Sequence, residues 1–328
     1  MNWKNSQVLV TGAAGFIGSH LVEHLMDLGA EVRAFVRYTS SGKIGNLEFI
    51  KNRENMEIFY GDLKDPYSVK KALKGVRFVF HLASLISIPY SYTNPREYFD
   101  NNITFILNIL QGIEEEGVDF VVHTSTSEVY GTAQYVPIDE KHPLVGQSPY
   151  SASKIGADKV VESFYLSFNS PVAILRPFNT FGPRQTTRAI IPTIIIQLLR
   201  GGNVFLGDIT TTRDFLYVKD SVRGFAKMVE KRSTTQGKTI NIGTGREVEI
   251  ETVARYLTDL INPKAEILLD KSKIRPKKSE VRQLCADITL AKEYLDWIPK
   301  YDLKRGLEET VDWMKENIDY YSQTKSFK

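Results

Sequence analysis

The sequence is poor in cysteine and histidine, and it has neither a long apolar run nor a large net charge. The single cysteine, Cys285, excludes an intrachain disulfide and a cysteine-rich zinc site. His20 and His24 share a helical spacing, but the glutamate of a helical metalloprotease motif does not follow the first of them. We therefore expect no metal site. The most apolar window, residues 189–199, is interrupted by Pro192 and is too short to cross a membrane.

The charge balance gives no sign of a polyanionic partner. The 328 residues include 42 Lys and Arg against 39 Asp and Glu, which leaves a formal net charge of +3. Nucleic-acid-binding proteins usually carry a basic stripe, so we expect no nucleic-acid partner. Residues 1–7 are polar and lead directly into a strand, without an apolar signal segment. Together with the scarcity of cysteine, these absences favour a soluble protein of the reducing cytoplasm.

The first half of the chain alternates short apolar runs with helical patterns of apolar residues. We expect strands over residues 8–11, 31–36, 58–60, 78–82, 120–124 and 172–175, and helices over residues 16–28, 66–73, 95–116 and 150–168. Strands that alternate with helices imply parallel pairing with right-handed crossovers. The pattern predicts an α/β fold with a Rossmann-type, doubly wound parallel sheet.

Three glycines, Gly12, Gly15 and Gly18, lie between the first strand and the first helix. Glycines in this place allow a tight turn and a close approach of the backbone, and the helix N-terminus then offers free N–H groups to a pyrophosphate. The turn therefore predicts dinucleotide binding. The alternative is a tight turn that serves packing only.

The end of the second strand should recognise the adenosine ribose of such a dinucleotide. An acidic side chain there binds a 2′-hydroxyl, whereas an arginine suits a 2′-phosphate. This strand ends at Arg37 and carries no acidic residue there, which favours NADP over NAD as the cofactor. The alternative is a solvated arginine, which is also common at a strand end. Asp62, after the third strand, is expected to face the adenine, because Asp65 is better placed to cap the helix that begins at Pro66.

After Pro177 the alternation stops, and prolines and glycines separate shorter elements. A basic stretch over residues 271–278 precedes a last apolar-periodic helix at 307–317. We expect a dinucleotide-binding domain over residues 1–178, with a return of the chain at about 215–245. A smaller C-terminal α/β substrate lobe would then occupy residues 179–328.

The predicted helix over residues 95–116 is apolar on nearly every face, so it must be covered on all sides. Burial within the monomer could cover it. A helix-on-helix homodimer through residues 95–116 and 150–168 is the other solution, and both stay open.

A tyrosine and a lysine four residues apart, Tyr150 and Lys154, share one face of the helix over 150–168. A nearby ammonium lowers the pKa of a phenol, which makes the phenolate available as a general base. The sequence holds four such Tyr-x-x-x-Lys pairs, where composition predicts about one. Only Tyr150 follows a strand that ends in a polar run, Thr126-Ser127-Glu128. Because ligands bind beyond the carboxyl ends of such strands, we expect these five residues in one cleft.

These motifs together resemble those of the extended short-chain dehydrogenases/reductases. The resemblance rests on Gly12-x-x-Gly15-x-x-Gly18, His81-Leu-Ala, Ser125-Thr126, Tyr150-x-x-x-Lys154, Arg176-Pro-Phe-Asn179, Gly182-Pro-Arg184 and Arg213-Asp-Phe, and it covers essentially the whole chain. Within that family the sequence is most similar to N-acetylglucosamine nucleotide 4,6-dehydratases of legionaminic-type pathways. The segments that carry this similarity are Thr126-Ser-Glu-Val-Tyr-Gly131, Ile88-Pro-Tyr-Ser91, Gly146–Lys154 and Lys278-Ser-Glu-Val281.

The resemblance implies a redox-neutral reaction on a nucleotide sugar with a tightly bound NAD or NADP. Thr126 would bind the sugar O4, and Tyr150 would take its proton while the C4 hydrogen leaves as hydride. Lys154 would hold the nicotinamide ribose and tune Tyr150. Glu128 would then remove the C5 proton, water would leave from C6, and the hydride would return to C6.

Ser127 departs from the pattern of glucose-nucleotide 4,6-dehydratases, which carry an aspartic acid at this place. A hydroxyl is far too weak an acid to protonate the leaving C6 hydroxyl unaided. Either Glu128 returns the proton or Ser127 relays it through water. GDP-mannose dehydratases and UDP-glucuronate decarboxylases share the Thr-Ser-Glu run, so a decarboxylase or an epimerase remains an alternative. A non-catalytic dinucleotide-sensing regulator is a remote one.

The resemblance also implies further contacts with both ligands. Arginine forks match phosphate oxygens and suit a nucleotide diphosphate. The expected cofactor contacts beyond the glycines, Arg37, Asp62, Tyr150 and Lys154 are Phe16, Ile17, Leu63, Leu82, Ala83 and Pro177. The expected contacts with UDP- or GDP-linked substrate are Ser87, Asn179, Arg184, Val204, Phe205, Arg213 and Arg282.

Overall fold

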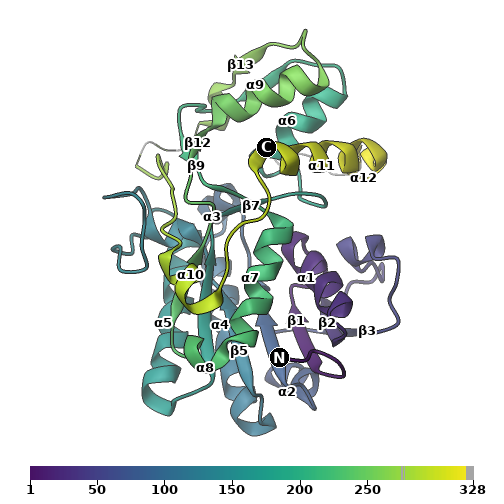
Figure 1. Ribbon diagram of the computed structural model, residues 1–328, viewed down its shortest axis with the longest axis vertical. Coiled ribbons are helices and arrows are strands. Elements are labelled where there is room, and N and C mark those ends of the chain that lie inside the picture. Colours follow the sequence, from purple (N-terminus) through teal and green to yellow (C-terminus); the bar gives the residue numbers. More distant parts are fainter. Residues whose placement is uncertain (275, 277, 323–328) are drawn as a thin grey trace.

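The computed structural model describes residues 1–274, 276 and 278–322, and its centre is one parallel sheet (Figure 1). Seven strands follow the order β11-β6-β5-β4-β1-β2-β3. The strands are β1 (Gln7–Thr11), β2 (Glu31–Arg37), β3 (Met56–Gly61), β4 (Phe78–His81), β5 (Phe120–Thr124), β6 (Val172–Pro177) and β11 (Thr239–Ile242). The order reverses between β1 and β4, which is where such sheets bind ligands at the strand ends. The predicted doubly wound α/β class is confirmed.

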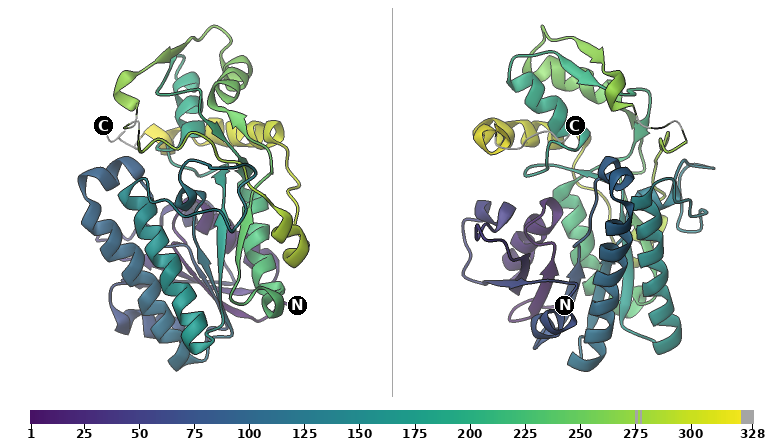
Figure 2. Two further views of the ribbon diagram at one scale, coloured as in Figure 1. Left: turned by 90° about the vertical axis from the view of Figure 1, so that its left-hand side faces the viewer. Right: turned by 180° about the vertical axis from the view of Figure 1, so that it is seen from behind.

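Helices cover both faces of this sheet (Figure 2). One face carries α1 (Phe16–Asp27) and α7 (Val218–Glu230), and the other carries α2 (Pro66–Leu73), α4 (Pro95–Glu116) and α5 (Pro149–Phe168). Side chains of a strand alternate between these layers: Val8 and Val10 of β1 join the first core, and Leu9 joins the second. Both faces are thus apolar, as expected of a covered parallel sheet.

A smaller lobe lies beyond the carboxyl ends of the strands (Figure 1). Its main elements are α6 (Ile190–Leu199), β8 (Val204–Leu206), α9 (Ile250–Ile261), β13 (Ile267–Leu269), α11 (Leu303–Glu316) and α12 (Ile318–Ser322). Two short strand pairs connect it to the sheet: β7 (Asn179–Phe181) with β10 (Phe215–Tyr217), and β9 (Thr212–Arg213) with β12 (Val248–Glu249). Between these segments the chain returns to the central sheet through α7 and β11, while α10 (Thr289–Leu295) and α8 (Arg232–Thr235) flank that return.

Several short elements differ from the sequence-based expectations. The last long helix, α11, begins at Leu303, four residues before the predicted start, because Asp302 caps it by accepting the N–H of Arg305. The short helix α3 (Ile88–Thr93) and the 3₁₀ turns η1 (Gly45–Phe49), η2 (Ser127–Tyr130) and η3 (Lys271–Lys273) had no predicted counterpart. Of the predicted basic stretch, Arg275 and Lys277 lie outside the described residues.

The apolar helix α4 is covered within the chain over most of its length. Ile106, Ile109 and Leu110 are fully buried against α2, α5 and the sheet. Phe99, by contrast, is 39% exposed. The monomer therefore supplies part of the predicted cover. In the described parts of the chain, no helix is long and apolar enough to span a membrane.

Candidate active site

The glycine turn between β1 and α1 leaves no room for a side chain at Gly12 or at Gly18. Gly12 has a φ of 68°, and a Cβ there would lie 2.8 Å from the Ala83 nitrogen. At Gly18 a Cβ would lie 2.1 Å from the Gly12 carbonyl oxygen. Helix α1 begins with no side-chain cap and no acidic residue in its first turn. This backbone cradle fits a dinucleotide pyrophosphate, whose charge the free N–H groups would stabilise.

The residues that follow β4 are hydrogen-bonded to the end of β1, beside the glycine turn. The Thr11 hydroxyl accepts the Ala83 N–H at 3.2 Å and lies 2.8 Å from Nδ1 of His81. The Leu82 N–H donates to the Thr11 carbonyl at 3.3 Å. These bonds bring the predicted cofactor residues Leu82 and Ala83 beside Gly12, so the ends of β1 and β4 lie side by side.

On the adenosine side, Arg37 ends β2 in register with Gly61, the last residue of β3, and both Arg37 and Asp62 are exposed. The Asp62 carboxylate accepts the Lys64 N–H at 2.9 Å. Asp65 caps α2 by accepting two backbone N–H groups, which confirms its predicted role. Arg37 and Asp62 therefore lie at neighbouring strand ends, open to a ligand.

The predicted catalytic residues meet where β5 ends. Thr126 caps the η2 turn by accepting the Glu128 N–H at 3.2 Å, and its hydroxyl also hydrogen-bonds the Tyr150 side chain. The Glu128 carboxylate is near enough to act on the Tyr150 hydroxyl electrostatically, and it is half-buried. Ser127 is only 2% exposed. The structure thus brings Thr126, Glu128 and Tyr150 together, with Ser127 in the wall behind them.

An aromatic contact fixes the ring of Tyr150. Tyr98 of α4 meets it edge-on, with the ring centroids 6.2 Å apart. The Tyr98 hydroxyl donates to the Ser87 carbonyl at 2.5 Å, and Ile88 packs against both rings. Ser87 itself caps α3 by accepting the Tyr90 N–H. The phenol of Tyr150 is therefore oriented by α4 and by the 84–94 segment.

The pKa of Tyr150 is raised above its ordinary value, chiefly because the side chain is buried. The hydrogen bond from Thr126 lowers this pKa, whereas the Glu128 carboxylate raises it. The expectation that a neighbouring ammonium would bring the pKa below its usual range is wrong here. The Lys154 ammonium instead donates to the Thr124 carbonyl at 2.7 Å, while desolvation of the phenol dominates.

Lys154 is also fully buried, and burial lowers its pKa to about 8. The Asp158 carboxylate, one helical turn further along α5, acts in the opposite direction and favours the ammonium. Near neutral pH the lysine is therefore charged but close to its titration range. A small change in its surroundings would alter its charge.

Most of the predicted substrate residues lie in the smaller lobe and in the short strands that connect it to the sheet. The amide oxygen of Asn179 is buried and has no hydrogen-bond partner in the structure. Arg213 pairs with Glu280 at 3.2 Å, and Arg282 is exposed. In β8, Val204 is buried and Phe205 is 44% exposed. Among these residues, the buried Asn179 oxygen and the exposed side chains of Arg282 and Phe205 are available to a ligand.

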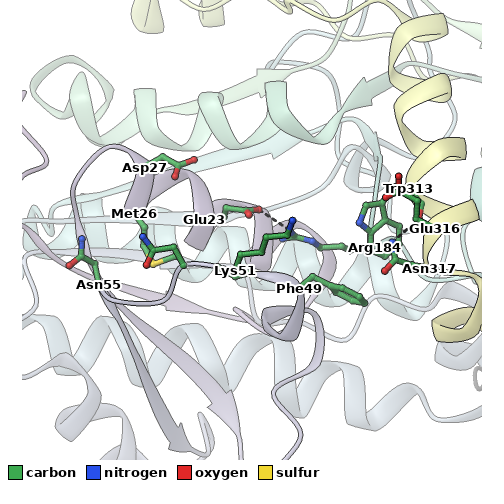
Figure 3. A pocket seen from close by; sticks show the side chains of 12 residues that line it. Glu23, Met26, Asp27, Phe49, Lys51, Asn55, Arg184, Trp313, Glu316 and Asn317 are labelled. Carbon is green, nitrogen blue, oxygen red and sulfur yellow. Dashed lines mark hydrogen bonds and ion pairs between the residues drawn. The ribbon is translucent and has the colours of Figure 1, made fainter.

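Arg184 lies apart from these residues. Its guanidinium pairs with Glu23 of α1 at 2.8 Å, in a groove of about 570 Å³ between α1 and α11 (Figure 3). Its carbonyl accepts the amide of Asn46 at 3.0 Å, and its φ is 67°. The ion pair with Glu23 joins Arg184 to α1, while its Nε and Nη1 are buried without a hydrogen-bond partner, so the contact with substrate stays a prediction.

Sequence reasoning missed several buried polar residues around the cluster. Asn102 of α4 donates to the Ser153 hydroxyl at 2.9 Å and accepts the Leu85 N–H at 2.8 Å. Asp158 and Arg176 form a buried ion pair at 2.8 Å. An asparagine within an apolar helix was a visible signal for Asn102. Among the described residues, no group of three or more His, Cys, Asp or Glu side chains could hold a metal ion.

The sheet is doubly wound, a glycine turn follows its first strand, and Thr126, Tyr150 and Lys154 gather at the end of β5. These features together define an extended short-chain dehydrogenase/reductase. Residues 9–310 match the family model described as GDP-mannose 4,6 dehydratase, and the chain belongs to that family.

Relatives of the chain include both epimerases and dehydratases. A putative UDP-glucose 4-epimerase from Methanocaldococcus jannaschii is 33% identical over 315 residues, which cover 94% of this chain and 99% of the relative. DesIV, a dTDP-glucose 4,6-dehydratase from Streptomyces venezuelae solved with NAD bound, has a TM-score of 0.86 at 30% identity and covers 97% of this chain and 100% of that one. A UDP-N-acetylglucosamine 4-epimerase from Methanobrevibacter ruminantium, solved with UDP-N-acetylmuramic acid, has a TM-score of 0.86 at 31% identity, with 96% and 99% covered. The chain is thus similar throughout to enzymes of nucleotide-sugar chemistry.

Proposed function

We propose that this protein is a nucleotide-sugar 4,6-dehydratase that converts UDP- or GDP-N-acetylglucosamine into a 4-keto-6-deoxy sugar. The observation that carries the proposal is the position of Glu128. Its backbone N–H donates to Thr126 and its carboxylate acts electrostatically on Tyr150, which favours Glu128 as the base for the C5 proton. A simple 4-epimerase removes no C5 proton and has no use for a carboxylate there.

In this reaction, the side chains at the end of β5 and on α5 would each have a defined role. Thr126 would bind O4 of the sugar. Tyr150 would take the proton of that hydroxyl after losing its own phenol proton, because only the phenolate can accept one. When bound, NAD or NADP accepts hydride from C4 and returns it to C6. Glu128 would remove the C5 proton, which the adjacent C4 ketone makes acidic. Water leaves from C6, so the overall reaction is redox-neutral.

We favour Glu128 over Ser127 as the source of the proton for the leaving hydroxyl. Ser127 is only 2% exposed, whereas Glu128 is half-buried. A carboxylate that has taken one proton can return it, as acid and base roles alternate in one catalytic cycle. Glu128 is therefore the group that we expect to serve both steps.

The cofactor would sit on the glycine turn, with the pyrophosphate at the start of α1. Gly12, Gly15 and Gly18 leave room for it, and Lys154 would hold the nicotinamide ribose. The open Arg37 at the end of β2 leans toward a 2′-phosphate, hence toward NADP. Residues 1–178 with the 215–245 return would bind this cofactor, and the lobe over residues 179–328 would bind the nucleotide sugar.

The partly uncovered α4 also supports a homodimer through α4 and α5. Phe99 of α4 and Leu166 of α5 leave large apolar surface exposed, 39% and 79% respectively. Exposed apolar side chains on two adjacent helices favour association. Sedimentation of the full chain would detect the dimer as a doubled mass, and a monomer at micromolar concentration would contradict it.

The test of the function is incubation with a panel of UDP- and GDP-sugars followed by mass spectrometry. Loss of one water from an N-acetylglucosamine nucleotide supports the proposal. Loss of carbon dioxide from UDP-glucuronate would show the decarboxylase alternative. An unchanged mass with altered NMR couplings would show the epimerase that several relatives represent. Binding of dinucleotide without any conversion would favour a regulator.

A further inference from the structure

One buried carboxylate, that of Asp158, has no part in the proposed chemistry. Its side chain is fully buried. One oxygen, Oδ2, accepts the Ser125 hydroxyl at 2.7 Å and the Arg176 guanidinium at 2.8 and 3.2 Å. The other oxygen, Oδ1, lies 3.5 Å from Nε2 of His123. A carboxylate held this closely in the interior must serve structure or function, because burying it is costly.

A second hydrogen bond joins α5 to the end of β5, one helical turn away from the bond between Asp158 and Ser125. Lys154 donates to the carbonyl of Thr124, and Asp158 accepts from the side chain of Ser125, the next residue along the chain. Lys154 and Asp158 are four residues apart on α5 and so share a face of that helix. Two bonds, one turn apart, therefore fasten α5 to the end of β5, directly before Thr126.

Few other charges reach Lys154. His81 of β4 and His123 of β5 face it, but burial lowers the pKa of both, to about 4 for His123, so both are neutral near pH 7. Arg176 of β6 is engaged with Asp158 and with the Tyr130 hydroxyl. Tyr150 remains a neutral phenol, because burial raises its pKa. Asp158 is thus the anion that faces the lysine.

We propose that Asp158 is a positioning residue for Lys154: through Ser125 it fixes α5 on the end of β5, and its charge keeps the lysine an ammonium. The inference rests on the proposed function, in which Lys154 holds the cofactor ribose. It adds a residue outside the Tyr-x-x-x-Lys motif to the groups that set the working pH of the enzyme.

The direct test is the pH profile of turnover for Asp158→Asn in the full chain. Without the carboxylate, the Lys154 pKa falls, so the alkaline limb, expected near pH 8, should move about one unit toward lower pH. At pH 8 this shift should lower kcat about fivefold, with KM within about threefold. Ser125→Ala is the matched control: it removes the fastening bond but keeps the charge. It should lower kcat and leave the alkaline limb in place. An unshifted limb in Asp158→Asn, or an equal shift in Ser125→Ala, would overturn the proposal.

A second measurement needs no substrate, and it tests the proposal even if Asp158→Asn alone does not fold. That variant leaves the Arg176 charge buried and unpaired, so the comparison is repeated in an Arg176→Gln background. There, a double-mutant cycle of Asp158→Asn and Lys154→Met should show a favourable coupling in urea denaturation at pH 6.5. The coupling should vanish above pH 9, where the lysine is neutral. A coupling absent at both pH values would refute the inference, whereas an inactive wild-type enzyme with the coupling intact would refute the proposed function alone.

Discussion

The substitution Glu128→Gln separates hydride transfer from proton removal. Glutamine keeps the size of the side chain, and the backbone N–H that donates to Thr126 is unchanged. The variant loses only the negative charge and the ability to accept a proton. Since the Glu128 carboxylate raises the pKa of Tyr150, its removal lowers that pKa toward the ordinary value. The first step, proton transfer to Tyr150 with oxidation at C4, should therefore survive or become slightly faster.

The second step should fail by a large factor. A positioned acid–base group contributes about a hundredfold or more, and a hundredfold corresponds to about 2.7 kcal/mol of transition-state stabilisation. We expect exchange of the C5 proton to slow by at least this factor. The neighbouring Ser127 is buried and too weak a base to replace the carboxylate.

The assay follows reduced nicotinamide at 340 nm and deuterium at C5 in the same sample in heavy water. Glu128→Gln should accumulate the reduced absorbance on addition of substrate, without deuterium at C5 and without dehydrated product. Glu162 is a partly exposed glutamate on α5 that pairs with Lys159, and Glu162→Gln is the matched control that should behave like the wild type. Wild-type exchange in Glu128→Gln would show that another group is the base, and the dehydratase proposal would lose its main support.

Three further predictions concern the base, the cofactor and the turn. Tyr150→Phe keeps the edge-on contact with Tyr98 and should lower the rate of C4 oxidation at least a hundredfold. Calorimetry should show that the substrate still binds. Turnover near the wild-type level would show that another residue is the general base. Protein purified without added nucleotide should release NAD(P) on extraction, and recovery of NAD alone would show that Arg37 does not select a 2′-phosphate. Gly18→Ala should lose the bound dinucleotide and should lower the Tm by several degrees, because the new Cβ would lie 2.1 Å from the Gly12 carbonyl oxygen. Gly202→Ala is the control and should change neither property, because the nearest atom to its Cβ lies at 3.7 Å.

The sequence was sufficient for features that depend on local pattern. The strand and helix ranges of the first half, the glycine turn and the Asp65 cap all follow from residues within about ten positions of one another. The same holds for the Thr126–Glu128 run at the end of β5. These features could be predicted because each has its own spacing or its own terminal residues.

Features that depend on burial or on distant partners could not be predicted in this way. The direction of the Tyr150 pKa shift is set by desolvation, which no spacing reveals. Arg184 matched a substrate motif, but its partner Glu23 lies 161 residues away in the sequence. The pairing of Asp158 with Arg176 likewise joins a helix to a strand 18 residues later. Such pairs become visible only once the sheet is assembled.

Transfer of a deuterium label from C4 to C6 tests the central claim most directly. The enzyme would be given its N-acetylglucosamine nucleotide with deuterium at C4, and the product would be examined by NMR and mass spectrometry. The account predicts a product lighter by one water, with the deuterium in the new C6 methyl group. A product of unchanged mass with the deuterium still at C4 would identify a 4-epimerase and contradict the account.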